Sequence, residues 1–194
     1  MGISKTITFD YEAYSEDLFS KALVDKIAEV IDQHKPDIVI THWPISDYPD
    51  FIAAGSAVLR ALLTRKLKKY PMLCFSETLT GKHTKCFHPS LYIDISKSIE
   101  KKKEACAVLW QGKQLDYFFY PFALPVAEFR GRECGVEFAE AYVIYYGSGY
   151  GLMPNWFPEE AKRAPVSLKN ATKLLEMREF VQGIYPTYPT RRRK

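Results

Sequence analysis

Histidine and cysteine are both scarce in this chain, with four residues of each among 194. The cysteines form no C-x-x-C pair, and no histidine lies at zinc-finger spacing from them, which excludes a zinc-finger framework. Cys74 and Cys106 lie in apolar segments, where cysteine behaves as a small buried hydrophobe. We therefore expect free thiols and a reducing, cytoplasmic location.

Long apolar runs and excess charge are also missing. No run approaches the length of a membrane span, and acidic residues occupy the part of the amino terminus where a signal peptide has its apolar core. The net charge of +4 comes entirely from the basic residues 191–194, because the remaining basic and acidic residues are equal in number. We therefore expect a soluble protein with no membrane span and no nucleic-acid partner.

The composition that remains is globular, with 47% hydrophobic and 14% aromatic residues. A chain of this length holds a substantial core within one domain. We predict a single α/β domain over residues 1–185, followed by a basic tail over residues 186–194.

Residues 35–63 contain a strand, a turn and a helix in immediate succession. The β-branched run 37–41 lacks polar alternation, which is typical of a parallel strand covered on both faces. Such strands place functional groups at their carboxyl ends, so the polar turn 42–50 is the candidate site. We expect Asp50 to cap the helix that begins near Phe51.

Further strands are expected at residues 72–75 and 91–95, and further helices at 15–34, 98–110, 128–146 and 168–182, from their hydrophobic periodicity. The alternation of strands and helices favours parallel strand–helix–strand units. The long polar connection 76–89 contains Glu77, His83 and His88, and loops of this length are often functional.

Five short segments occur in a fixed order between residues 7 and 142. They are Thr41-His42 with Tyr48-Pro49-Asp50-Phe51, then Phe75-Ser76-Glu77, the run from Phe87 to Ile95, the run from Lys101 to Gln114, and Arg130-Gly131 with Ala139-Glu140-Ala141. In this order they resemble the PIG-L/LmbE family of zinc-dependent de-N-acetylases. That family has T-H, H-P-D-H, an aromatic strand ending in Glu, F-x-P-x-x-Y-V-D-I, K…S-Q and R-G…A-E-A-F in the corresponding places.

The resemblance implies a Rossmann-like three-layer fold with a mostly parallel sheet, and hydrolysis of an N-acetylglucosaminyl amide. In the family, an amino-terminal A-H-P-D-D-E supplies two zinc ligands and the base, and the last histidine of H-P-D-H completes the metal site. This chain contains no A-H-P-D-D-E, so the sheet is expected to be incomplete at its amino-terminal strands. Phe51 stands at the remaining ligand position and has no lone pair, and Tyr48 replaces the family's other histidine.

These departures predict a pseudoenzyme that needs no zinc or other cofactor, with no catalytic residue assigned beyond the family-motif positions Tyr48, Asp50 and Phe51. His42, Trp43, Asp50 and Glu77 are the predicted pocket-lining residues. They could form a residual metal site, or could serve local hydrogen bonds and a helix cap. The aromatic rings nearby could stack on a sugar or fill the space left by the metal.

The sequence is also compatible with two other functions. One is a non-catalytic module that binds an N-acetylated sugar, or that pairs through an exposed sheet edge with a second copy or an amino-terminal partner chain. The other is an active enzyme whose missing ligands come from a separate polypeptide, which Phe51 argues against.

Overall fold

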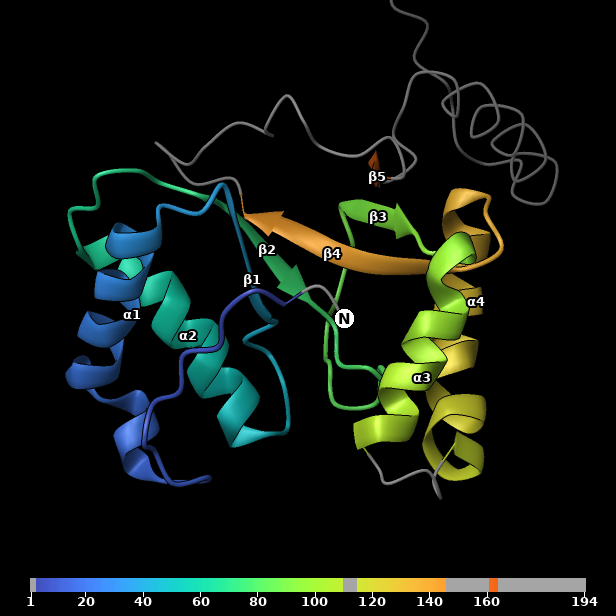
Figure 1. Cartoon of the computed structure of the whole chain (residues 1–194), viewed down its shortest axis with the longest axis horizontal. Helices are drawn as coiled ribbons and strands as arrows, with labels where there is room; N and C mark the ends of the chain where they lie inside the picture. The colour runs from blue at the N-terminus through green and yellow to red at the C-terminus, as the bar shows by residue number, and fades with distance from the viewer. Residues whose placement is uncertain (1–2, 110–114, 146–160, 164–194) are drawn as a thin grey trace, which may run out of the picture.

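The computed structural model describes residues 3–109, 115–145 and 161–163 (Figure 1). Its elements are, in order, the 3-10 helix η1 (Glu16–Phe19), α1 (Lys21–His34), β1 (Ile38–His42), α2 (Pro49–Thr64), β2 (Met72–Ser76), β3 (Leu91–Asp94), the 3-10 helix η2 (Ser96–Ser98), α3 (Ile99–Leu109), the π-helix η3 (Leu115–Ala123), α4 (Leu124–Cys134), β4 (Ala139–Tyr145) and β5 (Ala161–Arg163). The helix expected at 168–182 and the tail 186–194 lie outside the described residues.

The strands form one sheet in the order β1-β2-β4-β3-β5. The predicted α/β class is confirmed, and the expected parallel pairing holds between β1 and β2. The pairs β2–β4, β3–β4 and β3–β5 are antiparallel, so the sheet is mixed rather than mostly parallel. The difference arises because β4, which the sequence analysis assigned to a helix, lies between β2 and β3.

The helix expected over residues 128–146 is wrong beyond Cys134. Gly135 adopts the left-handed conformation, with φ of 79°, and its N–H donates to the carbonyl oxygen of Gly131 at 2.8 Å, which ends α4. From Ala139 the side chains alternate between the two faces of the sheet, and Ala139 and Ala141 are buried. The small side chains of this A-E-A segment therefore serve close packing on a strand.

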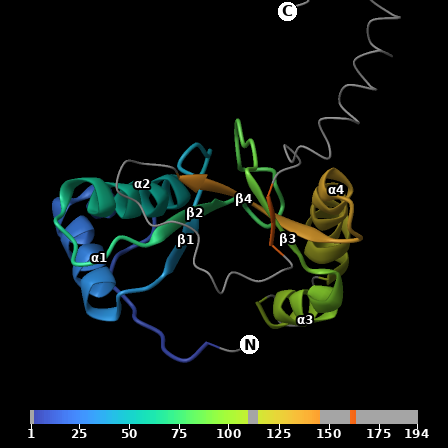
Figure 2. The same cartoon turned by 90° about the horizontal axis from the view of Figure 1, so that it is seen from above.

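Helices lie on both faces of the sheet. On one face, α1 and α2 bury the side chains of Leu73 and Phe75, and α4 contacts β4 beside the buried Ala139 and Ala141. On the opposite face α3 approaches β4, and the Lys102 ammonium on α3 lies 2.7 Å from the Glu140 carboxylate on β4. Figure 2 shows α1 and α2 at one end of the sheet and α3 and α4 at the other.

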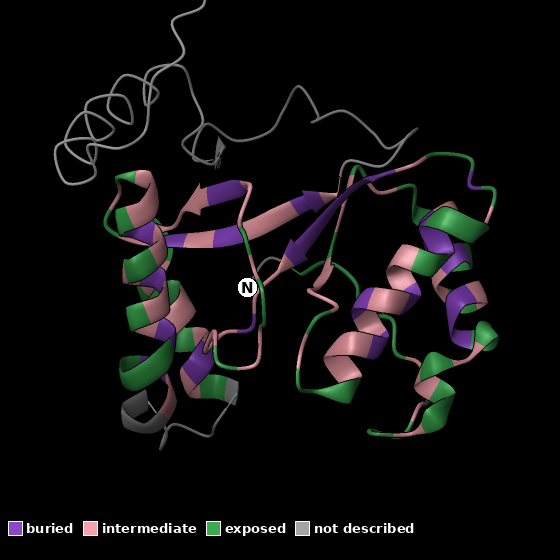
Figure 3. Cartoon of the chain, turned by 180° about the vertical axis from the view of Figure 1, so that it is seen from behind, coloured by how far each residue is buried: buried purple, intermediate pink, exposed green. Residues whose placement is uncertain are grey.

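The core follows the central strands and the inner sides of α1 and α2 (Figure 3). Cys74 and Cys106 are buried, as predicted, and all four cysteines are free thiols. Burial raises the pKa of the Cys74 thiol to about 11, so it stays protonated at neutral pH. Among the described residues, no helix has the combination of length and apolarity that a membrane span requires.

Candidate functional site

The carboxyl ends of β1 and β2 lie side by side, because His42 pairs with Ser76 in the parallel register. The turn that follows β1 and the loop that follows β2 are joined above these ends. Ser46 and Thr84 form an isolated bridge, and the Trp43 indole N–H donates to the carbonyl oxygen of Lys85 at 2.8 Å. We call these contacts the loop strap. The loop 77–90 is thus an ordered part of the candidate site.

Four of the rings near these strand ends pack in a row, which we call the aromatic stack. The His42 imidazole stacks on Phe51 with centroids 4.3 Å apart, and Phe51 stacks on Tyr48 at 5.2 Å. His83 contacts Tyr48 edge-on at 4.5 Å. Both faces of the Phe51 ring are therefore occupied by protein, and this side chain fills the space between His42 and Tyr48.

His42 lies at one end of this stack as a neutral imidazole. Its Nδ1 is buried and has no hydrogen-bond partner among the described residues. Burial lowers the pKa of His42, because the charged ring would lose its hydration. Among the rings of the stack, Phe51 offers no atom to a metal, and Nδ1 of His83 lies 3.1 Å from an oxygen of Asp47.

Asp50 does not cap α2, so that expectation was wrong. The helix begins at Pro49, its N-cap residue is Tyr48, and the Tyr48 side chain makes no capping hydrogen bond. Proline suits the first helical position because it has no N–H to satisfy there. Asp50 instead lies in the first turn, where its carboxylate accepts a hydrogen bond from the backbone N–H of Tyr14 at 2.9 Å. Its role is to hold the amino-terminal segment against α2.

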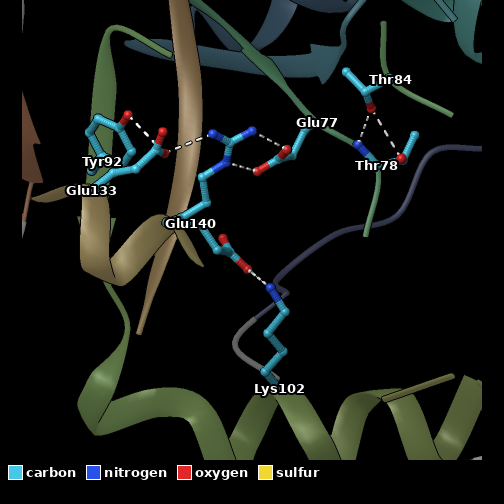
Figure 4. Close-up of polar contacts among 8 residues, drawn as sticks. Glu77, Thr78, Thr84, Tyr92, Lys102, Glu133 and Glu140 are labelled. Atoms are coloured by element: carbon cyan, nitrogen blue, oxygen red, sulfur yellow. Dashed lines mark hydrogen bonds and ion pairs between the residues drawn. The ribbon is translucent and has the colours of Figure 1, made fainter. Parts of the chain in front are cut away.

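Glu77 points towards α4, where Arg130 binds it with two parallel hydrogen bonds of 2.8 Å each (Figure 4). The side chains of Glu77 and Arg130 are only 10% and 12% exposed. Arg130 also donates to Glu133 at 2.7 Å, and the Tyr92 hydroxyl donates to the same carboxylate at 3.1 Å. A buried bidentate pair of this kind fixes the start of the loop to α4.

The remaining predicted residues are also held by protein contacts or face solvent. The Trp43 ring lies edge-on to Phe75 and Phe87, each at 5.7 Å. His83 Nδ1 lies 3.1 Å from an oxygen of Asp47, and His88 is exposed. The structure therefore brings His42, Tyr48 and Phe51 together, whereas Glu77 is directed to a separate ion pair.

These side chains do not fit a hydrolytic zinc centre, which needs three protein ligands around an open position. His42 provides a single buried nitrogen, the carboxylate of Asp50 is engaged by Tyr14, and that of Glu77 is engaged by Arg130. Within the described parts of the chain, no group of three histidine, cysteine, aspartate or glutamate side chains is arranged to hold a metal ion.

A cavity of about 270 Å³ opens beside the strand ends, on the face of the sheet that α3 approaches. Its polar lining includes Lys102, Glu140 and Tyr142. Sequence reasoning missed these residues as a site, although two of them lie in the segments that resemble the family. The sequence pattern predicts a helix for residues 139–145, so it gives no indication that α3 lies beside a strand formed by these residues.

Comparison with family models finds none that matches this chain, and no curated protein matches it. Solved structures do match. They include a conserved protein from Thermus thermophilus (19% identity, TM-score 0.54, 72% of this chain and 64% of that one). They also include GalB, the 4-carboxy-2-hydroxymuconate hydratase from Pseudomonas putida (18%, 0.53, 70% and 62%). A third is the N,N'-diacetylchitobiose deacetylase from Pyrococcus horikoshii (19%, 0.53, 71% and 56%).

This chain thus spans less than two thirds of the length of each of these three proteins. One of them is a hydratase and another a deacetylase, so the shared architecture supports more than one reaction. At this level of identity the likeness shows the fold alone. That fold, shared with N,N'-diacetylchitobiose deacetylase, is the one the sequence resemblance implied: the fold of the PIG-L/LmbE-type deacetylases.

Proposed function

We propose that this chain is a catalytically silent relative of the deacetylases with this fold, and that it binds an N-acetylated sugar without hydrolysing it. The observation that carries the proposal is the aromatic stack, in which Phe51 is packed between His42 and Tyr48 at the family's metal-ligand position. An aromatic ring held on both faces cannot turn aside to let a metal and its water enter without breaking these contacts.

The other side chains near the strand ends support the same proposal. A general base must have a free acceptor within reach of the attacking water, but both oxygens of Glu77 are bound by Arg130. Asp50 is directed to the amino-terminal segment, where one of its oxygens accepts from the amide of Tyr14. Sugar binding is supported by the fold shared with a chitobiose deacetylase and by the polar cavity beside the strand ends.

The test measures hydrolysis and binding on the same preparation. The chain is incubated with N,N'-diacetylchitobiose and zinc, released acetate is assayed, and binding of N-acetylglucosamine is measured by isothermal titration calorimetry. We expect saturable binding and no acetate above the protein-free control. Acetate release that is lost on treatment with a chelator would overturn the proposal of a silent relative.

The double variant Tyr48→His with Phe51→His sharpens this test, because it restores the two histidines of the family motif. We expect it to fold but to release no acetate, since the other two ligands and the base are still missing. Turnover by this variant, but not by the wild type, would show that the rest of the machinery lies elsewhere in the chain.

A second candidate function is association through the sheet edge. β1 is the terminal strand in the described sheet order, and it carries no charged residue or proline, which are the usual protections of an edge. Its Ile40 side chain is 59% exposed. A strand from a second copy, or from an amino-terminal partner chain, could pair there.

A further inference from the structure

The cavity beside the strand ends is lined by both polar and apolar side chains. We call it the Lys102 pocket. Lys102, Glu140, Tyr142 and Thr78 contribute polar groups, and Ile40 and Val126 contribute apolar surface. It lies against the carboxyl-terminal parts of β1 and β2, where open α/β sheets bind their ligands. Its position therefore agrees with the usual place of a ligand in such a fold.

Three polar side chains of the pocket form a preassembled set of hydrogen-bond donors and acceptors. Lys102 Nζ donates to Glu140 Oε1 at 2.7 Å (Figure 4). The Tyr142 hydroxyl donates to Glu140 Oε2 at 2.7 Å. An ammonium group has three donors and a carboxylate about four acceptor sites, so both groups keep capacity for a ligand after binding each other. Tyr142 holds the carboxylate in place because its hydroxyl occupies one oxygen.

The charges in the pocket balance, which limits the ligand. The Lys102 and Glu140 charges neutralise each other, and Glu77, which also lines the cavity, is bound by Arg130, which lies 2.7 Å from Glu133 as well. An anionic ligand would therefore meet no unbalanced positive charge in the pocket, and burying it would cost its hydration. A volume of about 270 Å³ is also slightly below the roughly 300–1,000 Å³ of pockets for drug-sized molecules. The ligand is therefore small and not anionic.

We propose that the Lys102 pocket binds one neutral sugar ring through two neighbouring hydroxyl groups. Glu140 accepts from one hydroxyl, Lys102 donates to the next, and the ring lies against Ile40 and Val126. A hydroxyl both donates and accepts, so a pair of adjacent hydroxyls matches a pair of adjacent charged groups. This inference rests on the proposed function for the class of ligand, and it assigns residues that neither the motif nor the fold comparison assigns.

The test uses the whole chain with N-acetylglucosamine, glucose, glucosamine and glucuronate as probes. Binding is measured by calorimetry for the wild type, for Glu140→Gln, and for Lys101→Met as a control on the same helix that alters an exposed lysine outside the pocket. Glu140→Gln should weaken the neutral sugars about tenfold or more, because a hydrogen bond to a charged group is lost. It should also strengthen glucuronate relative to glucose, because Lys102 is left with an unbalanced positive charge.

A second measurement keeps the test valid if Glu140→Gln is poorly folded. In the wild type, the methyl resonance of Ile40 should shift on addition of N-acetylglucosamine, whereas that of Ile27, which lies on α1 and packs against the core, should not. Tyr142→Phe, which leaves the ion pair in place, should weaken binding less than Glu140→Gln does.

The outcomes separate this inference from the function on which it rests. Sugar binding that is unchanged in Glu140→Gln, with no shift at Ile40, would overturn the pocket assignment and leave the proposed function standing. Failure of every neutral sugar to bind would overturn both. Binding of glucose as tight as that of N-acetylglucosamine, with the expected variant effects, would support the pocket and contradict specificity for the N-acetyl group.

Discussion

Glu140 shows how contacts with two neighbours decide the charge of a partly buried residue. Burial alone would raise the pKa of its carboxyl group, but the Lys102 charge and the hydrogen bonds from Lys102 and Tyr142 outweigh burial and lower that pKa below its usual value. The charged form of Glu140 is therefore the form that the folded protein stabilises.

This lowered pKa predicts an acid-sensitive contribution to stability. In the unfolded chain an ordinary glutamate binds a proton as the pH falls through about 4.3, whereas folded Glu140 resists protonation until a lower pH. The contribution is thus fully present above pH ~4.3 and is lost as the pH falls below it. Glu140→Gln should show a weaker loss of unfolding free energy than the wild type between about pH 4.5 and 3 in urea titrations.

The control for this prediction is Glu104→Gln, which changes an exposed carboxylate on α3. It should follow the wild-type curve. A Glu140→Gln curve that runs parallel to the wild type over the whole range would show that Lys102 does not hold the carboxylate in its charged form.

For individual residues, the sequence predicts where the candidate functional side chains lie along the chain better than it predicts which groups they contact. It placed His42, Tyr48 and Phe51 in one turn, because they are close in the chain. It could not predict that Arg130 binds Glu77, since the two residues are 53 positions apart. It also gave Asp50 the role of a cap, because the amide of Tyr14, a partner 36 residues away, could not be read from local spacing.

Among the elements, α2 and β1 approach each other most closely at Gly55. A Cβ atom added there would lie 2.3 Å from the carbonyl oxygen of His42 and 3.3 Å from the nitrogen of Pro44. Both neighbours are backbone atoms, so neither can turn aside. The absence of a side chain at Gly55 is what lets the amino-terminal half of α2 lie against the end of β1 and bring Phe51 to His42.

We therefore expect Gly55→Ala to destabilise the fold by about 3 kcal/mol or more, since overpacking costs roughly 1–3 kcal/mol even where side chains can adjust. Alanine favours a helix over glycine by roughly 1 kcal/mol, so a loss of stability would come from the clash. The neighbouring change Ser56→Ala should alter stability by less than about 0.5 kcal/mol. Chemical denaturation of both variants measures the difference, and a stabilised Gly55→Ala would contradict this packing.

The elements that the sequence predicted well are those determined by local signals. The helix expected over residues 15–34 divides at the extended Ser20 into η1 and α1. Its end at His34 and the strands β1 and β2 follow from periodicity and the stops at proline. The run from Ala139 to Tyr145 was assigned to a helix because apolar residues there also fit a period of 3.6. Gly135 was the signal for a helix end, and the pairing with β2 and β3 decided the strand, which is a tertiary effect.

For the molecule as a whole, the proposed association concerns the edge of the sheet at β1, which is the terminal strand of the described sheet. If two copies pair there, each covers the exposed Ile40 of the other and the free backbone groups of both strands are satisfied. A lysine at position 40 would place a charge in that contact, which is a common way of protecting an edge strand.

Ile40→Lys should therefore shift the population from dimer to monomer at a given concentration, as measured by analytical ultracentrifugation. Ile45→Lys is the matched control, because Ile45 is 49% exposed but lies in the turn after β1 rather than on the edge strand. Equal sedimentation of the wild type and both variants as monomers would rule out self-association through this edge.

The loop strap has a further consequence for motion. By joining the turn after β1 to the loop after β2, it closes the stretch of chain that contains α2 into a ring whose ends are tied at one place. Because the ends of this ring are tied, we expect α2 and β2, which lie within it, to open to solvent together, as one cooperative unit in amide hydrogen exchange.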